Sequence, residues 1–164
     1  MRKPGGFFYL NFPRCARSNH IMGTLYEDDV VAWSEQQAAL LRAGQWSQLD
    51  IDNIAEEIGD VGKSEKRALQ SRLAVLTSHL LKWKFQPTRR THSWQNTIRE
   101  QRVAIRQDIK KSPSLKSLLS NPRWVEASYR RALIDTYAET FLPGLPDEMP
   151  WAVTQIMSDE FFPE

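Results

Sequence analysis

The sequence has 164 residues, of which 41% are hydrophobic and 10% aromatic, enough for one domain with a packed core. Its apolar runs are all far shorter than the roughly 20 residues of a membrane span, and residues 7–10 are too few for the apolar region of a signal peptide. The single cysteine, Cys15, excludes an intrachain disulfide. We therefore expect a cytoplasmic protein without a membrane anchor.

The net charge is only +2, but the charges are unevenly distributed along the chain. Residues 26–62 contain nine acidic residues and one basic residue, Arg42, whereas residues 82–131 contain thirteen basic and three acidic residues. This segregation has two interpretations: basic helices pack beside acidic ones, or a basic face stays free for an anionic partner.

Residues 1–21 differ in character from the rest, because they contain Pro, Gly-Gly and no helical period. Met22 opens a stretch that is typical of a natural protein start. We expect residues 1–21 to be an extension from an upstream start site or an N-terminal arm, and residues 22–164 to form a single helical domain.

The helical pattern starts at Tyr26, where three acidic residues favour the positive end of a helix dipole, and it stops at Gly44, which suits a helix C-terminus. Asp50 is the expected cap of a second helix over residues 51–85. Its apolar residues keep one phase at about 100° per residue, and Pro87 ends it.

Two further main helices follow. The third is predicted over residues 93–111, capped by Ser93 or Thr91, and the fourth over residues 122–141, with Asn121 as its cap and Pro122 in its first turn. A last short helix is expected within residues 150–158. Strand-like alternation is missing, so the predicted fold is all-α: a helical bundle of four main helices with short extra helices.

Several polar residues share the phase of the apolar stripes. Glu65, Arg72 and His79 are spaced by seven residues on the long helix, and Arg102 lies between the isoleucines of the third helix. A charge that faces a core must be paired. We expect Arg72 and Arg102 to pair with glutamates, so the candidate polar pocket comprises Glu56, Glu57, Glu65, Arg72, His79, Arg102 and Glu139.

This polar set has two interpretations, a closed ladder that sets helix register or a pocket that binds a small anion or performs acid–base chemistry. Glu56 and Glu57 are adjacent and point about 100° apart, so they cannot form a catalytic dyad. His79 lacks the Glu-x-x-His spacing of carboxylate-bridged metal bundles, and no nucleophile elbow or phosphate-binding loop is present. We therefore predict no metal and no other cofactor. The sequence contains no catalytic motif, which leaves enzymatic activity open but without support.

A basic surface is also expected, because cations cluster with tryptophans around the third helix, as in nucleic-acid-binding proteins. Its candidate residues are Lys82, Lys84, Arg89, Arg90, Arg99, Arg106, Lys110 and Lys111.

Several ordered motifs carry a resemblance to a known family. They are "YEDDVVAWSEQQAALLRAG", "LDIDNIAEEIGDVG", "SRLAVLTSHLLKW", "SWQNTIREQRVAI", "SPSL", "AETF" and "FFP". Together they resemble the bacterial family called domain of unknown function 29, from about Leu25 to Pro163. The resemblance implies a small helical protein and brings no activity, cofactor or catalytic residue. It places motif residues at Glu56, Glu57, His79, Lys82, Trp83, Trp94, Arg102, Glu139 and Thr140.

The sequence therefore favours a protein-interaction or adaptor module, with a protein partner or a homo-oligomer. Nucleic-acid binding through residues 82–131 and a small-anion or enzymatic pocket around Arg72, His79 and Arg102 are the alternatives.

Overall fold

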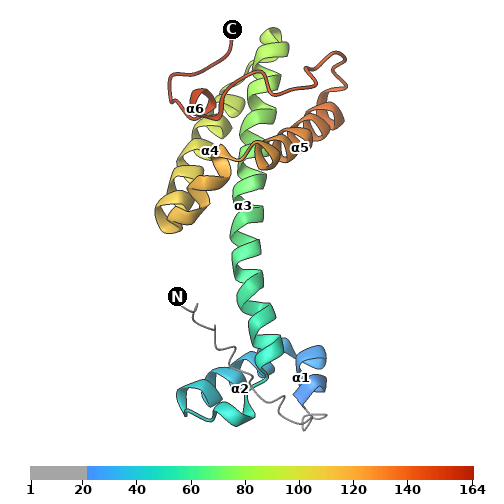
Figure 1. The fold of residues 1–164 in the computed structure, drawn as a ribbon. Coiled ribbons are helices and arrows are strands. Elements are labelled where there is room, and N and C mark those ends of the chain that lie inside the picture. Colours follow the sequence, from blue (N-terminus) through green and yellow to red (C-terminus); the bar gives the residue numbers. More distant parts are fainter. Residues whose placement is uncertain (1–21) are drawn as a thin grey trace, which may run out of the picture. The chain divides into compact units, whose positions relative to one another are not determined.

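A computed structural model describes residues 22–164, so the expectations for residues 1–21 lie outside the described part of the chain. The described elements are helical: α1 (Met22–Asp28), α2 (Val30–Arg42), α3 (Ile51–Phe85), α4 (His92–Lys111), α5 (Pro122–Thr140) and α6 (Val153–Ile156), with 3-10 segments η1 (Trp46–Gln48), η2 (Pro87–Arg89) and η3 (Pro113–Ser120) (Figure 1). The all-α prediction is confirmed.

The described residues form two compact units that divide within α3, after Glu57. The first unit contains α1, α2, η1 and the first turns of α3. Its centre is Trp33, which stacks edge-on against Tyr26 at 4.8 Å and donates its indole N–H to Asp50. Trp33 and Gln37 are its buried residues on α2.

The first predicted helix is interrupted at Asp29, where the structure begins a new helix. The Asp29 carboxylate accepts hydrogen bonds from the backbone N–H groups of Val31 and Ala32, which caps α2. The predicted end is confirmed, because Gly44 follows the C-cap of α2 with a φ of +67°.

The second unit, residues 58–164, contains the rest of α3 with α4, α5 and the C-terminal segment. Its apolar core combines residues of α3 and α4 with Leu115 and Ile156. The predicted turn between α3 and α4 is confirmed: α3 ends at Phe85, Pro87 opens η2, and the Thr91 side chain caps α4. Asn121 caps α5 as predicted.

Candidate functional site

The contact between α3 and α5 is built from small side chains. Ala74 and Ser78 are buried on α3, and Ser128, Ala132 and Thr136 are buried at four-residue spacing on α5. Small residues let two helix backbones approach closely. Thr136 Oγ1 and Ser78 Oγ lie 2.9 Å apart, so the contact also includes a hydrogen bond between hydroxyl groups.

Lys82 lies one turn beyond Ser78 on the same side of α3, and its ammonium group is buried. Nζ donates to Glu139 Oε2 at 2.6 Å and to His79 Nε2 at 3.4 Å, and it lies 5.5 Å from the centre of the Trp94 ring. The Lys82 side chain is 3% exposed, whereas Glu139 is 58% exposed. The three N–H groups of the lysine therefore have a carboxylate, an imidazole and an aromatic face as partners.

His79 is held in one orientation by its own helix. Its Nδ1 lies 2.9 Å from the carbonyl oxygen of Val75, which makes Nδ1 the donor and leaves Nε2 to accept from Lys82. Burial lowers the pKa of His79 below its ordinary value of 6.5, and this effect outweighs the hydrogen bond to Val75. His79 is therefore a neutral acceptor at neutral pH.

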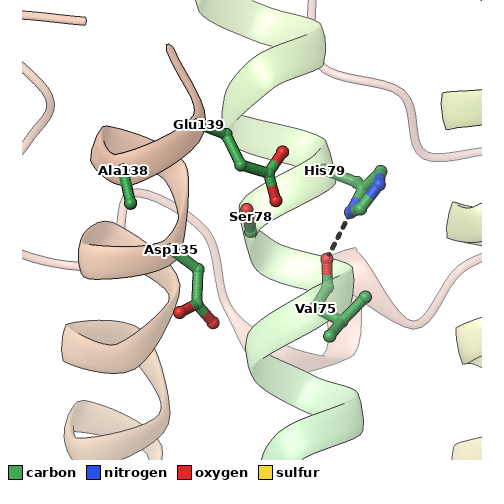
Figure 2. A pocket seen from close by; sticks show the side chains of 6 residues that line it. All are labelled: Val75, Ser78, His79, Asp135, Ala138 and Glu139. Carbon is green, nitrogen blue, oxygen red and sulfur yellow. Dashed lines mark hydrogen bonds between the residues drawn. The ribbon is translucent and has the colours of Figure 1, made fainter. Parts of the chain in front are cut away.

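A shallow hollow of about 230 Å³ lies beside this cluster. Figure 2 shows its lining: Asp135, Ala138 and Glu139 of α5 lie opposite Val75, Ser78 and His79 of α3. Drug-sized ligands occupy pockets of about 300–1,000 Å³. The hollow is smaller, and the polar groups of Lys82, His79 and Glu139 already bind one another.

Arg102 is fully buried and has no glutamate partner, so the predicted pairing is wrong. Its guanidinium donates to three backbone carbonyls of the C-terminal segment: Nε to Ile156 at 2.7 Å, Nη1 to Asp159 at 3.2 Å, and Nη2 to Phe161. It also lies 5.2 Å from the Phe162 ring centre. The guanidinium is a fork of fixed donors that binds all three carbonyls at once, so Arg102 holds the C-terminal segment against α4.

The other residues of the predicted polar set are dispersed. Arg72 pairs with Asp108 at 2.8 Å, and Glu65 pairs with Lys111 at 3.0 Å. In the first unit, Glu56 is exposed and Glu57 accepts a hydrogen bond from the Tyr26 hydroxyl at 2.7 Å. Of the predicted set, the structure brings only His79 and Glu139 together, around Lys82.

The predicted basic surface is largely engaged within the chain. Lys82 was expected on this surface but is buried, because α5 covers the side of α3 opposite its apolar stripe. Partners elsewhere in the chain bind four more residues: Lys84 (Glu164 carbonyl), Arg90 (Trp83 and Pro163 carbonyls), Arg106 (Asp159) and Lys111 (Glu65). Within residues 22–164, no hydrogen bond or ion pair engages Arg89, Arg99 or Lys110.

The outer side of α5 carries an exposed apolar surface that the sequence reading did not identify. Ile134, Tyr137 and Phe141 have the i, i+3, i+7 spacing of one helix face, and we call these three residues the α5 face. Ile134 is 68% and Phe141 74% exposed, and the Tyr137 and Phe141 rings lie edge-on at 5.9 Å. The spacing itself was the signal that could have revealed this face.

Phe141 also has an uncommon backbone. It ends α5 in the left-handed region with a φ of +53°, the one described residue other than glycine with a positive φ. A bulky residue is disfavoured in this conformation, which glycine or asparagine normally adopts. The chain thus places a large exposed ring at a position where a small residue would be more stable.

The described residues define an all-helical fold with a buried lysine that is paired with a largely exposed glutamate, and with an exposed helix face that carries aromatic side chains. The chain belongs to the family described as Domain of unknown function DUF29, whose model matches residues 25–162 and so confirms the resemblance. Neither a curated protein nor a solved structure matches it.

Two kinds of feature are missing from the part of the chain that the structure describes. In residues 22–164, no three His, Cys, Asp or Glu side chains are grouped closely enough to hold a metal ion. Over the same range, no helix combines the length and apolar character of a membrane span.

Proposed function

We propose that this chain is a protein-interaction module that binds its partner through the α5 face. The observation that supports this function is the exposure of Ile134, Tyr137 and Phe141 on one side of one helix. Aromatic side chains are enriched among the residues that dominate binding at interfaces. The left-handed backbone of Phe141 adds to this support, because a cost in folding stability is retained at functional positions.

The charges around the α5 face define the partner's chemistry. Arg123, Arg130 and Arg131 are exposed on the N-terminal half of α5. Arg130 pairs with Glu126 and Arg131 with Asp135 four residues along the helix, and such exposed pairs contribute little energy and exchange partners readily. A partner segment that has apolar residues bordered by carboxylates is therefore complementary to α5. Its apolar residues would contact the α5 face, and its carboxylates would pair with the exposed arginines of the N-terminal half.

The small-ligand alternative has less support from the geometry. The ammonium group of Lys82 is already bound by Glu139, His79 and the Trp94 ring, so an incoming anion would have to displace the chain's own carboxylate. Of the acids and bases that line the hollow, His79 and Glu139 are bound to Lys82, and Asp135 has a long ion pair of 3.8 Å with Arg131. In the α5 face, by contrast, the apolar side chains meet solvent.

The test is site-specific photo-cross-linking from position 137 in the full chain, with the adducts identified by mass spectrometry. Each captured protein is then purified and titrated against wild type, I134S/F141S and the control V61S, whose site is 66% exposed on α3. We expect at least tenfold weaker binding for I134S/F141S and unchanged binding for V61S. Equal affinities of all three chains would refute the function.

A further inference from the structure

We infer that the partner of the α5 face is a second copy of this chain, which contributes the acidic surface formed by the end of α1 and the first turns of α2. This inference rests on the proposed function and names the occupant. The acidic surface, which we call the α2 patch, consists of exposed Val30 and Val31 with Glu27, Asp28 and Glu35.

The α2 patch has the composition that the α5 face requires. Val31 is 64% exposed, and Val30 beside it is also exposed, so the patch offers apolar contact area. Glu27, Asp28 and Glu35, which lie within four or five residues of the valines along the chain, are also exposed. The neighbouring Asp29 carboxylate accepts from the N–H groups of Val31 and Ala32, which fixes the backbone that carries the two valines.

Charge complementarity selects this occupant. The α2 patch has three carboxylates and no basic residue. On the N-terminal half of α5, Arg123, Arg130 and Arg131 are exposed against one acid, Glu126, whereas Asp135 and Glu139 lie on the C-terminal half. The contrast extends over the sequence, because residues 26–57 contain eight acidic residues against Arg42 alone. Opposite potentials accelerate association, so the basic N-terminal half of α5 attracts the α2 patch, whereas α2 against α2 is disfavoured because it would bring like charges together.

The resulting interface is heterologous, because two different surfaces of identical chains meet. Each copy then offers one α2 patch and one α5 face, and contacts of this type generate closed rings or open chains. The inference therefore predicts assembly that grows with protein concentration and weakens as salt rises, since the charged borders of both surfaces are exposed to solvent.

Complementary variants test this geometry. V30S/V31S removes the apolar part of the α2 patch and I134S/F141S removes that of the α5 face, while both variants keep every charge. By light scattering after size exclusion at tens of micromolar, we expect wild type to assemble and each variant to be a monomer. A 1:1 mixture should form heterodimers, because one intact patch and one intact face remain.

Controls separate folding from association. V61S should assemble like wild type, and far-UV circular dichroism should show every variant folded. The E35R variant tests the charged part of the α2 patch. It should weaken assembly at least fivefold at low salt and have no such effect at high salt. A wild type that is monomeric at low salt, or a mixture that stays monomeric, would overturn the inference. If a different purified protein still required Phe141, the interaction function would stand without the second copy.

Discussion

Lys82 Nζ lies 2.6 Å from Glu139 Oε2, yet the lysine side chain is 3% exposed and the glutamate 58%. The pair joins a buried cation on α3 to a largely exposed anion on α5. Its two members therefore have different energetic roles. Removing the anion leaves a charge in the interior, whereas removing the cation leaves only a carboxylate that water already reaches.

We expect E139Q to cost about 2 kcal/mol of unfolding free energy, below the largest values for broken buried pairs because water reaches Glu139. K82M should change stability by less than about 1 kcal/mol, because Met fills a similar volume without a buried charge. Urea denaturation followed by circular dichroism measures both. D135N is the control on the same helix, since its ion pair to Arg131 is 3.8 Å long. A K82M chain less stable than E139Q would contradict the pairing.

The burial of Lys82 could not be predicted from the periodicity of apolar residues in the sequence. The apolar residues of α3 share one helical phase, and this phase correctly predicts the burial of Leu69, Leu73, Leu76 and Leu80. Ile51, Ile58 and Val61 of the same stripe, however, are 65%, 69% and 66% exposed. Lys82 lies on the opposite side, and one stripe cannot reveal that a second helix covers that side as well. The buried small residues at 74, 78, 128, 132 and 136, two of which join the helices through the hydrogen bond between Thr136 and Ser78, are a sequence signal of the α5 contact.

Arg102 illustrates a second limit. Its in-phase position predicted burial correctly, and it is fully buried. Its partners, however, are backbone carbonyls of Ile156, Asp159 and Phe161, and every residue type has such a carbonyl. The positions of carboxylate side chains in the sequence therefore give no indication of these carbonyl partners. The helix boundaries were easier to predict, because Thr91, Asn121 and Pro87 act within a few residues of their own positions.

Loss of the Arg102 guanidinium should release the C-terminal segment. R102M leaves three carbonyls without their donor, and we expect it to cost about 3 kcal/mol of unfolding free energy. Amide hydrogens of residues 156–162 should also exchange at least tenfold faster. R106M is the matched control, because Arg106 is partly exposed and binds Asp159 and the Met157 carbonyl from the solvent side. Equal effects of R102M and R106M would contradict the anchoring role.

The lowered pKa of His79 predicts how the free energy of unfolding depends on pH. Burial lowers its pKa in the folded chain below the ordinary value of 6.5, so the unfolded chain binds a proton more readily. The contribution of neutral His79 is therefore present above about pH 6.5 and is lost as pH falls through that value toward the folded pKa. The unfolding free energy, measured from pH 7.5 to 5.5, should fall more steeply for wild type than for H79Q. Identical slopes would contradict the shifted pKa.

Substitutions of Phe141 should have different effects on the stability of the fold and on its association. Its backbone has a φ of +53°, where glycine is unstrained and alanine is not, so we expect F141G to be more stable than F141A by about 1 kcal/mol. Both variants lose the ring that contacts Tyr137 edge-on and forms part of the α5 face, so both should associate at least tenfold more weakly than wild type. Thermal denaturation measures the first difference and light scattering the second.

The two readouts have different consequences. If F141A and F141G were equally stable, the left-handed backbone would carry no cost. If F141G were more stable than F141A but associated like wild type, the strain would be real and the ring would have no part in binding. The proposed function requires F141G to gain stability over F141A and to lose association, because the same residue that disfavours folding provides the contact surface.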